Sequence, residues 1–377
     1  MFLSKKTPLV AVDLGSHSIK VVQLKEIMGG NFELVNIGIM PLEEGCIVGG
    51  SIKEPKQVSE ALSRLIKAEK IKTSYVVASV SGEAVFIEKI KIPQMSGKEL
   101  SERITEEAEQ HIPFAINEVA LDFQVLGPFS DNTSHEKLDK QIDHDEEKAA
   151  DETEISDGPM AEALIVAVHR EIINERRNVL LQAGLKPAII DLDVFALMNA
   201  ASLTNDLSAM GSIALIDLGD SFSHLNILKN GSIGYTKDIP VGGGYCSTNL
   251  MSEYKIPFKQ THKIKGGYLP EGIKKEEAFA LILQGYKKIL EEIHKSFEYF
   301  TTISNSKVER IFLSGGGCLI HGIDDFIGNF LKIPAEILNP MQGVKINPKN
   351  FDKEMITALS GLSTVAIGLA TRRFAHS

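Results

Sequence analysis

Two stretches far apart in the chain share one pattern of apolar and polar positions. The first is VAVDLGSHSIKVVQL, residues 10–24, and the second is ALIDLGDSFSHLNIL, residues 214–228. Each begins with an apolar run, continues through Asp-Leu-Gly and several small or polar residues, and ends in a second run with alternating apolar positions. Such a pattern predicts a β-hairpin with a tight polar turn. The same hairpin is therefore expected once in each half of the protein.

The spacing of apolar residues predicts an alternation of strands and helices along the rest of the chain. After the first hairpin, a helix with one apolar face is expected over residues 58–69, between strands over residues 31–39 and 75–80. This order of elements is typical of the α/β class. Further strands are expected over residues 84–92, 163–170, 188–191 and 231–239, and further helices over residues 97–110, 171–183, 194–203, 243–254, 275–305, 322–331 and 359–373.

A strongly acidic stretch, residues 129–159, interrupts this alternation. Between residues 131 and 158 the chain has eleven acidic residues, three lysines and almost no large apolar side chains. Such a segment buries too little apolar surface to offset the entropy of ordering it. We therefore expect a disordered, solvated loop, with an acidic tether for a partner as the alternative. This stretch also supplies most of the net charge of −10, so the folded body is nearly neutral.

Length, composition and charge set limits on the class of protein. The chain has 377 residues, of which 43% are hydrophobic, and this size predicts two or three domains. The net charge of −10 and the lack of a basic cluster argue against nucleic acid as a partner. No apolar run reaches the length of a membrane span or a signal peptide, and the three cysteines have no metal-ligand spacing. We therefore expect a cytoplasmic protein.

The polar turns of the two hairpins carry the candidate chemistry. Gly15 and Gly219 allow the backbone to approach a ligand closely, and the serine hydroxyls and backbone N–H groups of such a turn suit phosphate oxygens. Asp13 and Asp217 can hold Mg²⁺ through its waters, and Lys20 can reach a phosphate as a point charge. A single Asp-Leu-Gly turn is more often a plain turn, and the histidine inside the first turn, His17, is expected to be exposed. The repetition of the turn in both halves favours a phosphate site.

A third segment, VERIFLSGGGCLI at residues 308–320, combines a strand with three consecutive glycines. Bare backbone at such a loop accommodates a flat nucleoside, and a following helix N-terminus favours an anion. Taken alone, the loop is only a turn. In their order and spacing, however, the two hairpins and this loop resemble the phosphate-1, phosphate-2 and adenosine segments of the actin-like ATPase superfamily.

Within that superfamily the chain resembles the FtsA-like branch and, more closely, the PilM family of type IV pilus assembly proteins. DLGSHSIKVVQL is similar to the opening motif of that family, and VLLQAGLKPAIIDLDVFAL, residues 179–197, is similar to its return into the first domain. Two further segments resemble that family. The sequence DIPVGGG stands before an expected helix, and the last similar segment is VAIGLATRR, residues 365–373. The expected fold is therefore α/β, with two RNase H-like domains and an FtsA-like 1C subdomain inserted in the first.

The resemblance also implies subdomain boundaries. Subdomain 1A is expected over residues 1–82, 188–211 and 359–377. Subdomain 1C is expected over residues 83–187 and includes the acidic loop. The second domain is expected to consist of subdomain 2A, residues 212–260 and 307–358, and subdomain 2B, residues 261–306.

The resemblance implies that the cofactors are ATP and Mg²⁺, with Asp13 and Asp217 at the metal. Lys265 stands where the family has the lysine of an Ala-Glu-x-x-Lys pattern. The implied nucleotide contacts are Asp13, Gly15, Ser16, Ser18 and Lys20 in the first loop, Asp217, Gly219, Ser221 and Ser223 in the second, Gly242 and Gly243 in the cleft, Lys265, and Gly315, Gly316 and Gly317 at the adenosine.

This chain departs from the family pattern at four positions around these sites. Thr261 and His262 replace the Ala and Glu that precede the lysine, which affects contact with the ribose. Asn249 stands where an Asp is common, and Asp220 adds a negative charge to the second loop, where it would repel a phosphate unless it points away.

The function implied by the resemblance is a cytoplasmic, ATP-binding scaffold of the type IV pilus inner-membrane assembly complex. Such a protein binds the N-terminal cytoplasmic tail of PilN in a groove between subdomains 1A and 1C, and through it lies at the inner face of the inner membrane. Other pilus inner-membrane proteins, the assembly ATPase and a homo-oligomeric ring are further implied partners. The alternatives are a small-molecule kinase of the superfamily, an FtsA-like division or filament protein, and the cytoplasmic part of a type II secretion protein. Whether ATP is hydrolysed stays open.

Overall fold

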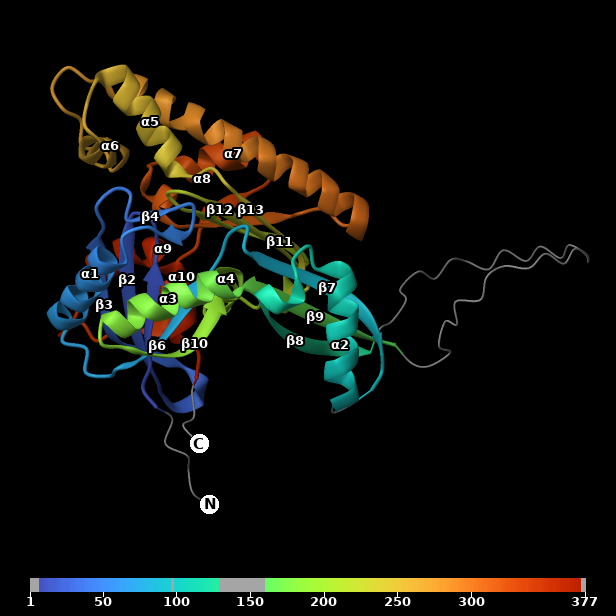
Figure 1. Ribbon diagram of the computed structural model, residues 1–377. Coiled ribbons are helices and arrows are strands. Elements are labelled where there is room, and N and C mark those ends of the chain that lie inside the picture. Colours follow the sequence, from blue (N-terminus) through green and yellow to red (C-terminus); the bar gives the residue numbers. More distant parts are fainter. Residues whose placement is uncertain (1–6, 96–97, 129–159, 374–377) are drawn as a thin grey trace, which may run out of the picture. The chain divides into compact units, whose positions relative to one another are not determined.

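The computed structural model describes residues 7–95, 98–128 and 160–373 (Figure 1). The acidic stretch of residues 129–159, for which the sequence predicts a disordered loop, lies outside the described residues.

The chain divides by its contacts into two compact units. The first consists of Met1–Glu83 together with Glu171–Ser377, and the second is the inserted segment Ala84–Arg170. Each unit has hydrophobic clusters of its own.

The first unit contains two large sheets, each built around one of the predicted hairpins (Figure 1), and a small sheet of two short strands. In the six-stranded sheet, β1 pairs antiparallel with β2 to form the first hairpin and parallel with β6 on its other side. In spatial order its strands are β10 (Lys186–Leu192), β6 (Tyr75–Val80), β1 (Val10–Leu14), β2 (Ser18–Glu26), β3 (Phe32–Pro41) and β16 (Val344–Lys345).

The five-stranded sheet repeats this arrangement around the second hairpin. There β11 pairs antiparallel with β12 and parallel with β14, so both hairpins expected from the sequence are confirmed. In spatial order its strands are β13 (Ser232–Ile239), β12 (Ser223–Lys229), β11 (Ser212–Leu218), β14 (Arg310–Ser314) and β15 (Ala335–Ile337).

The six-stranded sheet is covered on both faces, because alternate residues of its central strands are buried in different clusters. Val10 and Val12 of β1 pack with α1 (Pro55–Ala68) and α3 (Arg170–Gln182). Ala11, which points to the opposite face, packs with α4 (Asp193–Ala201) and α10 (Thr364–Ala370). A strand buried on both faces is typical of parallel α/β sheets.

Helices α5, α7 and α8 share the core of the five-stranded sheet (Figure 1). The long helix α7 buries a stripe that includes Ile282, Ile289, Ile293 and Phe297, as its amphipathic pattern predicts. Over the residues that the structure describes, no helix is long and apolar enough to cross a membrane. The helices of this half are α5 (Gly243–Tyr254), α6 (Phe258–Lys265), α7 (Lys275–Ser304) and α8 (Ile323–Leu331).

The single helix expected over residues 359–373 is wrong, because two helices occupy this region. Helix α9 (Lys353–Leu362) ends before Ser363, whose φ of −105° and ψ of 15° are not helical, and α10 begins at the next residue. The Gly361 carbonyl accepts a hydrogen bond from the Gly315 backbone N–H, at 2.9 Å. Contact with the glycine loop therefore competes with helix continuation at this point.

Helix α10 crosses α4 closely. Every residue of α10 is buried, and a Cβ atom at Gly368 would overlap the backbone carbonyl of Ala196. Only glycine therefore fits at this crossing.

Over its described residues, the second unit has three strands, one α-helix and a short 3-10 helix, Ile116–Glu118. Strand β9 (Met160–His169) lies between β7 (Val85–Pro93) and β8 (Val119–Pro128) and pairs antiparallel with both. The core of this unit includes Ile104 and Ala108 of the charged helix α2 (Lys98–His111).

Candidate functional site

A cavity of about 290 Å³ lies in the first unit, where the turns of the two hairpins meet the glycine loop after β14. This loop continues into a short 3-10 turn, Gly316–Leu319. Helix α6 and the start of α5 complete the wall. The candidate residues that line the cavity are Asp13, Gly15, Ser16, Ser18, Lys20, Asp217, Gly219, Ser221, Gly243, Lys265, Gly315, Gly316 and Gly317.

Two candidate residues, Ser223 and Gly242, are not among those that line the cavity. Ser223 is fully buried, and its hydroxyl donates to the Val241 carbonyl at 2.9 Å. Gly242 precedes α5, whose first N–H group, that of Gly243, donates to the Gly219 carbonyl at 2.8 Å. These residues therefore hold the second turn against α5 from behind.

The first turn places a buried ion pair in the cavity. Lys20 stands directly opposite Asp13 across the hairpin, and its Nζ lies 3.1 Å from Asp13 Oδ2. Burial lowers the pKa of Lys20, but the ion pair outweighs burial and the net shift is upward. Burial, together with the charges of Asp193 and Asp217, holds the pKa of Asp13 above its usual value, against the opposing effect of Lys20. Carboxylates thus gather at this point of the cavity.

The second turn is oriented by contacts with neighbouring elements. Asp217 Oδ1 accepts a hydrogen bond of 2.7 Å from the hydroxyl of Ser314 at the end of β14. Lys265 Nζ lies 3.9 Å from Asp220 Oδ1 and donates to the Gly243 carbonyl at 3.2 Å. Lys265 therefore offsets the extra negative charge that Asp220 brings to this turn.

The glycine loop presents bare backbone to the cavity. Gly315 has a φ of +84°, which disfavours other residues, and a Cβ atom at Gly317 would lie 2.6 Å from the Tyr286 hydroxyl. Tyr286 is itself buried in α7 and lines the same cavity. The loop therefore keeps a flat surface beside the second turn.

Two histidines stack across the cavity, so the prediction that His17 is exposed is wrong. His17 is half-buried, and its ring centroid lies 4.0 Å from that of His262, at an interplanar angle of 24°. Burial, together with the charges of Lys265 and His17, lowers the pKa of His262 to about 3. Burial also lowers the pKa of His17. The stack is therefore uncharged at neutral pH, and it joins the first turn to α6.

His224, which lines the cavity, is linked through Asp238 to the end of the six-stranded sheet. Its Nδ1 lies 2.6 Å from Asp238 Oδ1, and Asp238 Oδ2 accepts from the backbone N–H of Gly82 at 2.5 Å. Burial opposes the charging of His224, but Asp238 outweighs it and raises the pKa of His224 to about 9. A protonated histidine thus connects the two sheets through one carboxylate.

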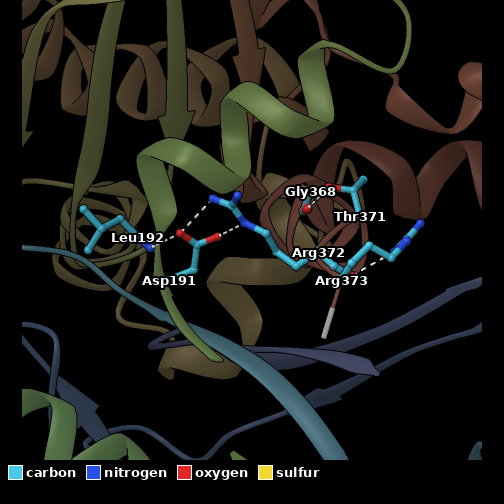
Figure 2. Close-up of polar contacts among 6 residues, drawn as sticks. All are labelled: Asp191, Leu192, Gly368, Thr371, Arg372 and Arg373. Atoms are coloured by element: carbon cyan, nitrogen blue, oxygen red, sulfur yellow. Dashed lines mark hydrogen bonds and ion pairs between the residues drawn. The ribbon is translucent and has the colours of Figure 1, made fainter. Parts of the chain in front are cut away.

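Asp193 enters the cavity at the start of α4, directly after β10. A bidentate ion pair fixes the end of that strand: Arg372 Nε lies 2.6 Å from Asp191 Oδ2, and Arg372 Nη2 lies 3.1 Å from Oδ1 (Figure 2). Asp191 Oδ1 also accepts from the Leu192 N–H at 2.9 Å. The two parallel hydrogen bonds of this bidentate pair hold the strand end, and hence Asp193 soon after it, in place.

Several lining residues are not among those predicted from the sequence. Asp193 follows an apolar strand in the same way as Asp13 and Asp217, so its position at a strand end was a usable signal. The other residues stand in ordinary contexts. In addition to Asp193, they are Ser79, Ser81, Arg176, His224 and Tyr286.

The acidic side chains of the cavity do not form a direct metal centre. Within the described ranges, no three His, Cys, Asp or Glu side chains are grouped closely enough to hold a metal ion. Carboxylates such as those of Asp13 and Asp217 are also the groups that can hold a cation through its water ligands, which Mg²⁺ tends to keep.

The arrangement of two hairpin-centred sheets around one cavity is that of the actin-like ATPase fold. The chain resembles the structure of a PilM-PilN type IV pilus biogenesis complex with a TM-score of 0.79 and 23% identity, covering 97% of this chain and 98% of that chain. It also resembles the ethanolamine utilization protein EutJ from Carboxydothermus hydrogenoformans with a TM-score of 0.56 and 13% identity, covering 97% of this chain and 90% of that chain.

The sequence comparison identifies the family. The model described as type IV pilus assembly protein PilM matches residues 11–142 and 137–374. The chain therefore belongs to the PilM family of type IV pilus assembly proteins.

Curated relatives outside this family match over shorter stretches. The chain is 23% identical to EutJ of Salmonella typhimurium over 147 residues, which are 39% of this chain and 46% of EutJ. It is 25% identical to the cell division protein FtsA of Helicobacter pylori over 210 residues, covering 48% of this chain and 42% of FtsA. The chain thus spans less than half the length of these relatives.

Proposed function

We propose that the cavity binds ATP together with Mg²⁺, and that the protein serves the type IV pilus assembly complex as a nucleotide-binding scaffold. The observation that carries this proposal is the convergence of two Asp-Leu-Gly turns and a glycine loop on one cavity. These segments are far apart in the chain. If each were only a local turn, nothing would require all three to lie at the same cavity.

The residues of the cavity fit a phosphate chain and a hydrated cation. Lys20 and Lys265 supply positive charge, and a Cβ atom at Gly15 would lie 2.9 Å from Lys20 Nζ, in the space beside the turn. Asp13 and Asp217 hold Mg²⁺ through water, and Mg²⁺ supplies charge neutralisation to the phosphates. Burial, and after it repulsion from neighbouring carboxylates, raises the pKa of Asp13, and a cation there would relieve that repulsion.

The glycine loop and the two turns bind different parts of the nucleotide. Gly315, Gly316 and Gly317 accept the adenosine on bare backbone, and backbone N–H groups and serine hydroxyls of both turns bind the phosphates. Because the turns belong to different sheets, their joint contacts with one ligand favour the arrangement in which the sheets are held together. Such a change of population requires that ATP bind this arrangement more tightly.

The partner that we propose is the N-terminal cytoplasmic tail of PilN. Support comes from the family membership and from the similar structure, whose name is that of a PilM-PilN complex. The other proposed partners are further pilus inner-membrane proteins, the assembly ATPase and copies of the same chain in a ring. Binding to PilN would place the protein at the inner face of the inner membrane. We also propose the division of the first unit into subdomains 1A, 2A and 2B.

The nucleotide site is tested by isothermal titration of the full chain with ATP in the presence of Mg²⁺. Replacing Asp13 removes both the cation ligand and the partner of Lys20, so D13A is expected to lower ATP affinity by about tenfold or more. The matched control is D325A, because Asp325 is exposed on α8. Equal affinities of D13A and the wild type would show that the phosphates bind elsewhere.

The partner is tested by the same method with a synthetic peptide of the PilN tail, with and without Mg-ATP. Saturable binding that depends on the nucleotide is the expected result. A lack of binding in both nucleotide states would remove PilN from the proposal and leave the nucleotide site untouched.

A further inference from the structure

Arg176 of α3 is a buried cation whose side chain lines the cavity. It is 5% exposed, and its Nη2 donates to the Gly50 carbonyl at 2.8 Å. Its Nε and Nη1 atoms are buried and have no hydrogen-bond partner among the residues that the structure describes. A guanidinium has five N–H donors and stays charged in proteins, so a buried one is normally paired.

The neighbouring carboxylates do not satisfy these donors. Glu175 is engaged with the adjacent hairpin, where it accepts from the Ile52 N–H at 3.0 Å and the Ser51 hydroxyl at 3.2 Å. The charges of Asp193, Glu175 and Asp13 favour the protonated arginine, but burial outweighs them and lowers the pKa of Arg176. Arg176 thus lies in a field of carboxylates without a hydrogen-bonded anion of its own.

The order of groups in the cavity indicates which anion would meet Arg176. A Cβ atom at Gly315 would lie 2.9 Å from Asp217 Oδ1, so the glycine loop adjoins the second turn. Arg176 belongs to α3, which packs on the six-stranded sheet, whereas the glycine loop follows β14 of the five-stranded sheet. With the adenosine at the glycine loop, the phosphate chain would extend past the second turn toward the six-stranded sheet, and its last group would lie on the side of Arg176.

We propose that Arg176 binds the terminal phosphate of a nucleoside triphosphate and makes the site prefer the triphosphate to the diphosphate. This inference rests on the proposed ATP site. The planar guanidinium matches two phosphate oxygens in a bidentate manner, which a lysine does not. The second N–H of Nη2 and one of the unpaired atoms, Nε or Nη1, supply the two donors of such a fork.

The same residue connects the terminal phosphate to a short hairpin, β4 (Ile47–Val48) with β5 (Ser51–Ile52). Arg176 and Glu175 hold this hairpin through the hydrogen bonds to Gly50, Ser51 and Ile52. Occupation of the terminal phosphate position would therefore order the hairpin, whereas a diphosphate would leave the guanidinium unpaired.

The experiment compares ATP and ADP affinities of full-length variants by isothermal titration with Mg²⁺. R176Q removes the charge and is expected to weaken ATP binding by about tenfold or more and ADP binding by less than about twofold. R176K keeps the charge but cannot make a bidentate contact. We therefore expect it to lower the affinity for ATP by an intermediate amount and to leave the affinity for ADP unchanged. The matched control is R177Q, because Arg177 is the neighbouring exposed arginine of α3 and should keep wild-type affinities.

The outcomes separate the inference from the proposed function. A wild-type protein that binds neither nucleotide would overturn the ATP site itself. If the wild type binds ATP, an equal effect of R176Q on ATP and ADP, or no effect on either, would assign Arg176 a structural role and overturn the inference. If R176Q does not fold, R176K and hydrogen exchange of the wild type decide: ATP, but not ADP, should slow exchange at residues 47–52, and identical exchange with both nucleotides would refute the proposal.

Discussion

At the residue scale, the cavity is defined by charges that are paired across elements. His224 and Asp238 illustrate this, because burial disfavours the charged form of both groups, and their mutual contact is the main effect that opposes burial. His224 comes from β12 and Asp238 from β13, in directly paired positions. The register of the two strands determines which residues form such a cross-strand pair, and the type of side chain at either position does not.

This pair predicts a dependence of stability on pH. The pKa of His224 is raised from 6.5 to about 9, so its stabilisation is complete below pH 6.5 and is lost as the pH rises through 9. The contribution is at most about 3 kcal/mol. As the pH is raised from 6.5 to 9, the melting temperature of the wild type should therefore decrease more than that of H224Q. The control is H321Q, which replaces an exposed histidine and should follow the wild type. Parallel curves for the wild type and H224Q would contradict the prediction.

At this scale, the sequence predicts those site residues that are positioned by elements close to them in the chain. Asp13 and Lys20 face one another because a tight hairpin places them opposite each other, and a turn of this kind is visible as a pattern. Arg176 was not predictable, because its importance depends on helix packing that leaves two donors unpaired. Ser223 looked equivalent to Ser221, but the pleat of β12 turns it into the core instead.

At the element scale, packing between helices decides what local periodicity cannot. The apolar run of residues 359–373 has a continuous helical pattern, and the break before α10 lies where the Gly361 carbonyl bonds the glycine loop instead of the next helical turn. The long helix α7, in contrast, was predicted almost to the residue because thirty residues keep one apolar stripe. Long amphipathic elements are therefore predictable from sequence, whereas short buried ones depend on their surroundings.

The crossing of α4 and α10 predicts the effect of a substitution at Gly368. G368A adds a Cβ atom that overlaps the Ala196 carbonyl, so the helices must move apart. Overpacking of this kind typically costs about 1–3 kcal/mol. The free energy of unfolding, measured by urea denaturation, should fall by an amount in that range. The matched control is G361A in α9, where the added Cβ would lie 3.7 Å from its nearest neighbours. A loss of stability at Gly361 as large as that at Gly368 would argue against the close crossing as the cause.

At the scale of the whole molecule, the chain is two units with separate cores, and the second is inserted into the first. The inserted unit begins and ends at adjacent positions, because Val85 pairs with Val168 and the His169 N–H donates to the Ala84 carbonyl at 3.0 Å. An insertion with neighbouring ends places little constraint on the unit that carries it. The subdomain boundaries expected from the resemblance remain a prediction.

This arrangement predicts that the first unit folds and keeps its nucleotide site without the second. Replacing residues 84–169 by a short Gly-Ser linker should preserve cooperative unfolding, because the residues that line the cavity all belong to the first unit. ATP affinity measured by titration should stay within about twofold of the full chain, as expected for a site whose contacts are unchanged. The reciprocal fragment, residues 84–170, should fold around its own cluster of Ile90, Ile104 and Ile165. If the linker variant unfolds, or folds without binding ATP while the full chain binds it, the inserted unit must contribute to the site, because no other part of the chain has been changed.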